Sequence, residues 1–262
     1  MQERFPQNLD IFDKNQFWFL NYRETLYKNY FKNHLGKRSG EEYKNQFEEE
    51  KRQFLRDLES ISSSLNRSGK YFDAGCGTGS LLSVLSDLGF KNLSGMDISK
   101  EQVDVAKSFN IAYVEEGDVL SFLQSTEQTF DGIFSMDFVE HLTKDELINY
   151  LLTVKNKLKD NGFLICRTPN ADAPVSSIYA FGDASHETIL NKKSAEQLFT
   201  SCGFDKVIVW PSSVRTNGFL KEIIRRITYS VYLTFRKMVL FMNGYSNKEV
   251  IHSPNLLIYC KK

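Results

Sequence analysis

The sequence predicts an α/β protein with a Rossmann-like, seven-stranded, mostly parallel sheet and helices on both of its faces. Three observations support this fold class. From residue 69 onward, short apolar segments alternate with segments of helical period, which is typical of a parallel sheet wound with helices. A glycine-rich loop follows the first apolar segment. Before residue 69, glycine and proline are scarce, and the stretch 16–65 follows a helical rhythm.

Residues 1–68 are expected to form an N-terminal helical cap region. After residue 40 the apolar residues Phe47, Phe54, Leu58, Ile61 and Leu65 recur at steps of seven, four, three and four. This spacing places them on one stripe of an amphipathic helix, with charged residues on the rest of its surface. A serine–glycine pair at positions 68 and 69 ends the helix. We therefore expect helices first and the sheet afterwards.

The Rossmann-like core is expected over residues 69–210, and the final strand over residues 255–262. Helical segments connect the strands. The clearest is predicted over 144–159, where Leu147, Leu151, Val154 and Leu158 form one face before an Asn-Gly break. Another helix is expected over 194–202. The seven predicted strands begin at Lys70, Asn92, Ile111, Phe130, Gly162, Gly203 and Asn255.

A long insertion, residues 211–254, separates the last two strands and contains a cationic helical stretch over 219–242. We expect this helix to act as a cap over a substrate site or to pack on another subunit, with contact to an anionic membrane interface as the alternative. Its longest uncharged run, 227–235, has nine residues, whereas a membrane-spanning helix needs about 20. No transmembrane segment is expected. The basic residues are Lys221, Arg225, Arg226, Arg236 and Lys237.

Composition and charge argue against several classes of protein. A hydrophobic fraction of 41% with 25% charged residues is typical of a globular chain. Thirty-three basic and 33 acidic residues give a formal charge of zero, which makes a nucleic-acid partner unlikely on this ground. The four cysteines form no CxxC motif. The polar start of the chain has no apolar signal region, so we expect a cytoplasmic location, with peripheral contact at the cytoplasmic membrane face left open.

The glycine loop after the first predicted strand contains Gly75, Gly77 and Gly79, preceded by Asp73. Glycine lets a strand-to-helix turn adopt positive φ and lets a ligand lie against bare backbone. The pattern is GxGxG, with Ser80 where a dinucleotide fingerprint has its last glycine. A carboxylate at position 73 would repel a pyrophosphate but would suit the cationic amino group of a methionine moiety. NAD is therefore not the expected ligand.

Acidic residues also follow the next two predicted strands. Asp97 lies 22 residues after Gly75, where a carboxylate at the end of a strand can accept both hydroxyls of a ribose. The neighbouring Ile98 can pack on an adenine ring. Asp118 follows the third strand and can accept a hydrogen bond from the adenine amino group.

Five motifs in order, DAGCGTG from Asp73, MDIS, EEGDV, FDGIFSMDFVEHL and GFLICRTPN, resemble those of class I S-adenosylmethionine-dependent methyltransferases. The resemblance covers roughly residues 69 to 210 and the closing strand. It implies S-adenosyl-L-methionine as the cofactor. The residues implied to bind it are Asp73, Gly75, Gly77, Gly79, Asp97, Ile98, Asp118, Val119 and Ser135.

Methyl transfer to a hydroxyl requires removal of its proton, by a base such as histidine or with help from a metal ion. Asp137, Glu140, His141 and His186 follow the fourth and fifth predicted strands, at the edge where such sheets bind ligands. A helical turn would project Asp137 and His141 to one side. His141, His186 and Asp137 are the candidate catalytic residues.

The segment DFVEH resembles the ExxEH element of metal-dependent O-methyltransferases, such as small-RNA 2′-O-methyltransferases and ubiquinone-biosynthesis enzymes, with Asp137 in place of the first glutamate. There a later histidine after a TPN-like segment, here His186, completes the site. The resemblance implies Mg²⁺ or Mn²⁺ on Asp137, Glu140, His141 and His186. Two alternatives stay open: EHL as a packing element that binds no metal, and His141 as a general base without metal.

The whole chain is similar to methyltransferases of bacterial cell-surface polysaccharide biosynthesis. This similarity implies O-methylation of a sugar hydroxyl, on a nucleotide sugar or a lipid-linked glycan. The alternatives are a metal-dependent enzyme acting on an RNA 2′-hydroxyl or on a phenol or quinol, and a non-catalytic S-adenosylmethionine-binding regulator. Neutral overall charge argues against RNA. The polar residues retained on the acceptor side argue for an enzyme.

Overall fold

The sheet has seven strands in the order β3-β2-β1-β4-β5-β7-β6, as the computed structural model shows for Arg23, Leu26 and residues 40–262. Neighbouring strands run parallel except β7, which is antiparallel to both β5 and β6. The predicted fold class is confirmed. The strands are β1 (Lys70–Ala74), β2 (Asn92–Asp97), β3 (Val114–Glu116), β4 (Phe130–Met136), β5 (Leu158–Pro169), β6 (Lys206–Pro211) and β7 (Asn255–Lys261).

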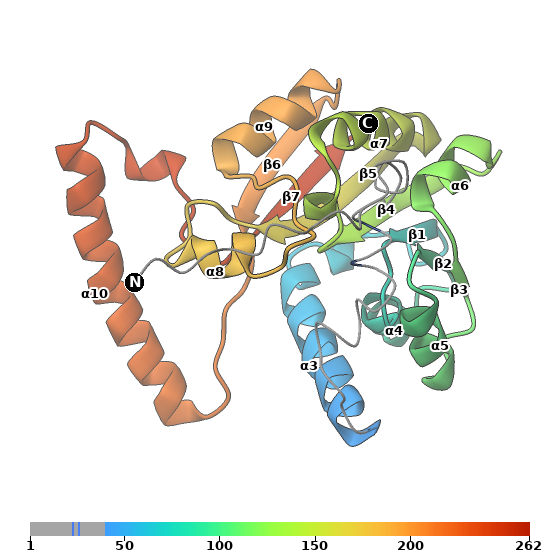
Figure 1. Cartoon of the computed structure of the whole chain (residues 1–262), viewed down its shortest axis with the longest axis horizontal. Coiled ribbons are helices and arrows are strands. Elements are labelled where there is room, and N and C mark those ends of the chain that lie inside the picture. Colours follow the sequence, from blue (N-terminus) through green and yellow to red (C-terminus); the bar gives the residue numbers. More distant parts are fainter. Residues whose placement is uncertain (1–22, 24–25, 27–39) are drawn as a thin grey trace, which may run out of the picture.

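Helices cover both faces of this sheet (Figure 1). One face carries α3 (Gly40–Leu58), α4 (Ser80–Asp87) and α5 (Lys100–Ser108), and the other carries α6 (Val119–Ser125), α7 (Lys144–Lys157) and α9 (Lys192–Ser201). Successive side chains of β1 serve the two layers: Tyr71 packs in the cluster with α3 and α4, and Phe72 in the cluster with α6, α7 and α9. Full burial of such a large side chain stabilises the fold by roughly 1.5 to 3 kcal/mol.

Local sequence signals fix where several helices begin. Thr143 and Glu146 form a capping box at α7, in which each side chain bonds the backbone of the other residue. Asn191 and Ser194 do the same at α9, so this helix begins two residues earlier than the predicted 194. Ser99 caps α5 by accepting from the backbone nitrogen of Gln102.

Two predicted helices end earlier in the structure. The amphipathic helix predicted to reach Leu65 stops at Leu58, and a 3-10 turn, η2 (Ser62–Ser64), follows it. Ile61 and Leu65 still pack against the core beside α3. The helix predicted to reach residue 159 stops at Lys157 because Leu158 is extended and pairs with Phe130 of β4. Apolar spacing alone could not predict this helix end, because Leu158 is buried as a strand residue just as it would be on the buried face of the helix.

The sheet order determines where a ligand can bind. β1 lies between β2 and β4, so the chain winds outward from β1 in both directions. Loops that leave the carboxyl ends of β1 and β4 then turn to opposite faces and leave a crevice between them. Asp73 lies near the end of β1, in register with Gly95 on β2 and Phe134 on β4. The candidate cofactor residues are therefore at this switch point.

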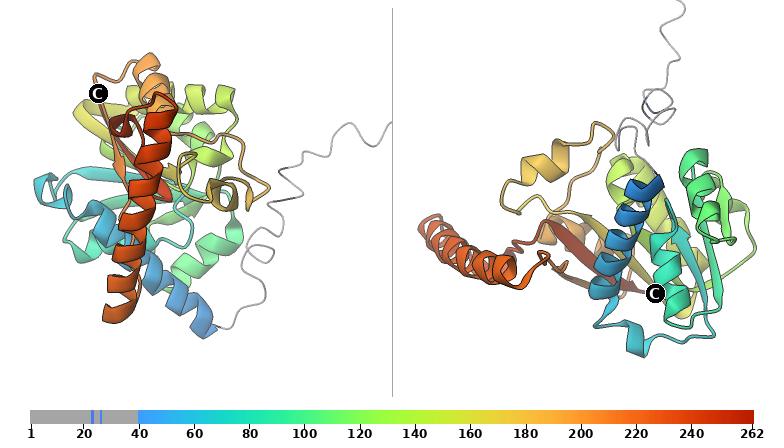
Figure 2. Two further views of the ribbon diagram at one scale, coloured as in Figure 1. Left: turned by 90° about the vertical axis from the view of Figure 1, so that its left-hand side faces the viewer. Right: turned by 90° about the horizontal axis from the view of Figure 1, so that it is seen from below.

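Two segments extend from the layered core. Residues 170–190 contain the short helix α8 (Ser176–Phe181), and the insertion between β6 and β7 contains α10 (Phe219–Met242). Figure 2 shows α10 standing apart from the layers, on the side of β6 and β7. None of its residues is buried. Among the helices of the described residues, none is long and apolar enough to cross a membrane.

Candidate active site

A cleft of about 1660 Å³ opens at the switch point of the sheet. It is lined by the loops after β1, β2, β3 and β4 and by Gln46, Glu50 and Phe54 of α3. Residues of α10 do not line it, so the expected cap over the acceptor site by 219–242 stays a prediction. The part of the predicted N-terminal cap before residue 40 falls outside the described residues, apart from Arg23 and Leu26. Of these two residues, Arg23 lines the cleft.

Positive φ angles at the three loop glycines form the turn after β1. At Gly75, where φ is 74°, an added Cβ would lie 2.6 Å from the ring of Phe138. At Gly77, where φ is 50°, it would lie 2.9 Å from Oε1 of Gln102. Gly75 therefore requires glycine for both conformation and space, whereas at Gly77 the positive φ is the constraint, because the end of the Gln102 side chain can move. Gly79, with φ of 76°, is the residue before α4 and does not line the cleft.

Asp97 holds the glycine loop as well as facing the cleft. Its Oδ2 accepts a hydrogen bond from the backbone nitrogen of Gly77 at 2.9 Å, and its Oδ1 accepts one from that of Ser99 at 2.8 Å. The side chain is buried, and burial raises its pKa while the two backbone amides oppose that shift. A carboxylate fixed in this way has its remaining lone pairs held in a constant orientation for a ligand.

Asp73 is 2% exposed, and its Oδ1 has no hydrogen-bond partner among the described residues. Burial raises the pKa of this carboxyl well above its usual range, and the negative charge of Asp97 adds to the shift. An unpartnered buried carboxylate oxygen is costly unless a donor or cation binds it. Because Asp73 lines the cleft, that donor can come from a ligand.

The other expected cofactor residues divide into two groups. Ile98, 56% exposed, and Val119 line the cleft together with Asp118, whose Oδ1 also caps α6 by accepting from the backbone nitrogen of Ser121 at 2.8 Å. Ser135 lies elsewhere. Its side chain is buried, hydrogen-bonded to the hydroxyl of Tyr150 and outside the cleft lining, so the expected cofactor contact is corrected. A side chain within β4 points into the helix layer rather than past the strand end.

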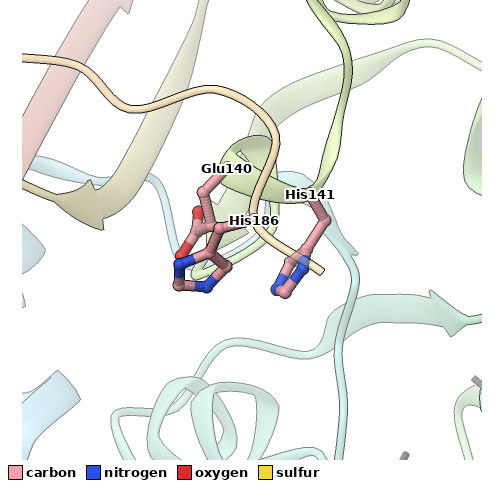
Figure 3. Close-up of side chains that lie close together, drawn as sticks. All are labelled: Glu140, His141 and His186. Atoms are coloured by element: carbon pink, nitrogen blue, oxygen red, sulfur yellow. The ribbon is translucent and has the colours of Figure 1, made fainter. Parts of the chain in front are cut away.

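On the acceptor side, Glu140, His141 and His186 come together (Figure 3). One possible metal-ligating atom from each residue, an imidazole nitrogen or a carboxylate oxygen, lies within 4.8 Å of the other two. The two imidazole centroids are 4.9 Å apart with the rings tilted by 66°. His141 lines the cleft, while Glu140 is 1% exposed with its Oε2 lacking a hydrogen-bond partner among the described residues. Burial raises the pKa of Glu140 well above its usual range, with a further contribution from the charge of Asp137.

Backbone hydrogen bonds join the two loops that carry these residues. The carbonyl of Glu140, in the 3-10 helix η3 (Val139–His141), accepts from the backbone nitrogens of Glu187 at 2.7 Å and Thr188 at 3.0 Å. The hydroxyl of Thr188 donates to the carbonyl of Leu142 at 2.6 Å. The distance between His141 and His186 is thus set by the protein backbone, not only by side-chain rotamers.

Hydrogen bonds to Nδ1 indicate which nitrogen of each histidine carries the lone pair. Ser185 donates its hydroxyl proton to Asp183 at 2.6 Å, so its oxygen accepts from Nδ1 of His141 at 3.0 Å. Nδ1 of His186 lies 3.1 Å from the carbonyl of Ala180, which only accepts. In the neutral rings, Nε2 therefore has the lone pair. Burial, reinforced by His186, lowers the pKa of His141 to about 4, so this imidazole is neutral at pH 7.

Asp137 does not belong to this group, which corrects its expected place among the metal ligands. Its φ is 56°, so the chain turns sharply after β4 instead of continuing into the helical turn that the spacing predicted. The carboxylate forms a two-point ion pair with Arg167, with Oδ1 2.9 Å from Nε and Oδ2 in contact with Nη2. Arg167 also reaches Asp57 of α3 at 3.3 Å and lies 4.5 Å over the ring of Phe54.

Sequence reasoning missed Arg167 and Asp57. A single arginine in the apolar run of β5 was a usable signal, because buried arginines in central strands are rare without a partner. Asp57 had no such signal, since it lies among the many charged residues of α3.

A Rossmann-like sheet with a glycine loop and fixed carboxylates at its switch point is the arrangement of an α/β protein that binds a nucleoside-containing cofactor. The family model described as a methyltransferase domain matches residues 45–212, so the chain belongs to the methyltransferase-domain family. Its cofactor is S-adenosylmethionine. The unpartnered Oδ1 of Asp73 fits the amino group of that cofactor, and the oriented lone pairs of Asp97 fit its ribose.

Solved structures show the same fold. The chain is similar to an S-adenosylmethionine-dependent methyltransferase from Archaeoglobus fulgidus, with 21% identity, a TM-score of 0.60 and coverage of 84% of this chain and 100% of that one. A second similar structure is the magnesium protoporphyrin IX methyltransferase of Synechocystis PCC 6803 with bound S-adenosylhomocysteine. Its identity is 15%, its TM-score is 0.57, and the match covers 92% of this chain and 98% of that one. It is also similar to a plantazolicin methyltransferase bound to S-adenosylhomocysteine, with 17% identity, a TM-score of 0.56 and coverage of 92% of this chain and 95% of that one. A search of curated proteins finds no match.

Proposed function

We propose that the chain transfers a methyl group from S-adenosylmethionine to a hydroxyl oxygen of a sugar, in the synthesis of a surface glycan or a nucleotide sugar. The observation that supports this is the position of His141 in the cofactor cleft, in ring contact with His186. When bound, the cofactor supplies an electrophilic methyl group on its sulfonium. The carbon–sulfur bond breaks as the carbon–oxygen bond forms, and the hydroxyl proton must go to a base.

His141 is the proposed base. Its Nε2 has the lone pair, and the hydrogen bonds from Nδ1 through Ser185 to Asp183 orient the ring and stabilise the positive charge that it gains with the proton. The products are a methyl ether, S-adenosylhomocysteine and a protonated imidazole, which then loses its proton to water. His186 is not among the residues that line the cleft, and it is proposed to act through its ring contact, by positioning the imidazole of His141.

A sugar is favoured as acceptor because charged and polar side chains stand among the apolar ones, such as Phe138 and Leu142, on this side of the cleft. Arg23, Asp137, Glu146 and Arg167 line it together with His141. Several donors and acceptors in fixed geometry suit a polyhydroxyl ring, whereas a quinol or porphyrin ring would bury more surface against apolar side chains. The retained histidine pair also favours an enzyme over a regulator that only binds the cofactor.

A divalent ion is the second candidate for activating the hydroxyl. The site would supply one buried carboxylate oxygen and two imidazole nitrogens, from Glu140, His141 and His186. Mg²⁺ and Mn²⁺ prefer a set with more carboxylates. Three protein ligands would leave coordination positions for the substrate. Bound there, a metal ion would lower the pKa of the acceptor hydroxyl. Asp137 is not proposed as a ligand, since Arg167 holds its carboxylate.

The experiment incubates the full chain with labelled S-adenosylmethionine and, separately, nucleotide sugars, lipid-linked glycans, RNA and quinols. We expect label in a sugar fraction. His141→Ala should lower the rate by on the order of 10² to 10⁴, the usual contribution of a general base. Glu187→Gln, at an exposed position next to His186, is the control and should keep full activity.

Chelator separates the two mechanisms. If His141 is a simple base, activity persists in chelator; if Glu140, His141 and His186 hold an ion, activity disappears and returns with Mg²⁺ or Mn²⁺. Cofactor affinity, measured by calorimetry, should be unchanged in His141→Ala. Full activity of His141→Ala and His186→Ala in chelator would exclude both roles, and label only in RNA or quinol would overturn the sugar proposal.

A further inference from the structure

The outer face of α10 is a continuous apolar stripe. Its large apolar residues recur at steps of three and four, so they lie on one side of the helix along its whole length, about 36 Å for 24 residues. These side chains are between 52% and 74% exposed. Contiguous apolar surface of this kind marks an interaction site. The stripe consists of Leu220, Ile224, Ile227, Val231, Phe235, Met238 and Met242.

The opposite face of α10 holds the helix to the rest of the protein. The hydroxyl of Tyr229 donates to the carbonyl of His252 at 3.0 Å, and Nη2 of Arg236 donates to the carbonyl of Asp172 at 3.4 Å. Both residues are partly buried, whereas the stripe residues are exposed. Figure 2 shows no other element of the described chain on the outer side of α10. The apolar stripe therefore faces outward in the folded protein.

Basic residues border the stripe. Lys221, Arg226 and Lys237 are exposed and lie on its two flanks by helical spacing. The helix contains one acidic residue, Glu222, and its carboxylate bonds Arg225 and Arg226 at 2.7 Å within the helix itself. The outer surface thus combines an apolar centre with positive borders.

We infer that α10 lies in the interfacial plane of an anionic lipid bilayer, with the apolar stripe among the acyl chains and its basic borders on the headgroups. Apolar area and positive charge on one side of a helix are the two properties that drive such binding. A second copy of the chain fits less well. Two stripes packed against each other would place Lys221, Arg226 and Lys237 of both copies along one seam with no acidic residue opposite them.

The test mixes the full-length protein with vesicles of phosphatidylcholine alone and with vesicles that also contain phosphatidylglycerol, and measures the sedimented fraction. We expect binding to the anionic vesicles, weak binding to the neutral ones and loss of binding in high salt. Lys237→Gln should lower the partition coefficient about fivefold, and Val231→Asp should lower it by on the order of tenfold or more.

Leu152→Asp is the matched control, because Leu152 is 45% exposed on α7, far from α10 in the sequence and outside the cleft lining. It should bind vesicles like the unmodified protein. Equal binding to neutral and anionic vesicles, or no effect of Val231→Asp, would overturn the inference. So would a vesicle-independent dimer, detected by sedimentation velocity, that Val231→Asp dissociates. The inference does not rest on the proposed acceptor, since it is argued from the exposed surface of α10 alone. Cofactor affinity should be unchanged in each α10 variant, which shows that the cleft is intact.

Discussion

At the scale of single residues, the cofactor cleft uses carboxylates whose environments differ. Asp97 accepts two backbone hydrogen bonds and keeps the loop in place. Asp73, in the same cleft, has an oxygen with no partner among the described residues. The hydrogen bonds of Asp97 stabilise the ligand-free fold, whereas the unpartnered oxygen of Asp73 destabilises it until a cationic group binds there. Asp73 is therefore a position where binding and stability oppose each other.

Asp73→Asn should separate the two effects. The pKa of Asp73 is raised in the folded state, so the unfolded chain ionises at lower pH and folding stability falls as pH rises from the usual aspartate range toward the raised value. At neutral pH the amide should therefore keep or raise the Tm of the ligand-free protein. It should weaken cofactor binding by roughly 1.5 to 3 kcal/mol, the contribution of a charged hydrogen bond.

Thermal denaturation with and without S-adenosylhomocysteine, together with calorimetry, measures both quantities for Asp73→Asn. Asp87→Asn serves as the control, because that side chain is 66% exposed and pairs with Lys51 on the surface. Normal cofactor affinity in Asp73→Asn would refute the assignment of this carboxylate to the amino group.

At the scale of elements, α3 is attached to the sheet through buried polar contacts as well as apolar ones. Phe47, Phe54 and Leu58 supply the apolar contacts. Asp57, fully buried, accepts from the hydroxyl of Ser212 at 2.9 Å and pairs with Arg167 of β5. Because α3 also lines the cleft, this attachment fixes one wall of the site.

Arg167→Met should be strongly destabilising, because it leaves the carboxylates of Asp57 and Asp137 without their cation. We expect a loss of roughly 3 to 5 kcal/mol in the free energy of unfolding by urea titration. Lys159→Met is the control: it breaks an ion pair with Asp131 whose side chains are 45% and 29% exposed, and should cost under about 1 kcal/mol. Similar losses in the two variants would show that the buried pair has no special role.

At the scale of the whole molecule, the insertion that carries α10 joins two strands that are already neighbours. Pro211 at the end of β6 is in register with Leu256 near the start of β7, so the sheet does not depend on α10 to bring them together. None of the residues that line the cleft comes from α10. The cleft and the exposed apolar stripe of α10 are therefore built from different residues of one chain.

Replacing residues 219–243 with a glycine–serine linker of the same length should keep cofactor affinity within about twofold, as expected for sites that share no contacts. Calorimetry with S-adenosylhomocysteine measures this. The same variant should lose vesicle binding. A large loss of cofactor affinity with an otherwise intact fold would mean that α10 does contribute to the cleft, as the sequence led us to expect.

The sequence by itself determined the sheet, the order of its motifs and the cofactor loop. These follow from local rules: period 2 or 3.6 in apolar residues, and glycine where φ is positive. Only the tertiary structure decided which side chains meet. His186 reaches His141 because backbone hydrogen bonds join two loops distant in sequence, and Asp137 turns to Arg167 because its φ is 56°. The amphipathic pattern of α10 predicted an apolar face, but its outward direction depends on contacts such as that of Tyr229 with His252, which no local spacing encodes.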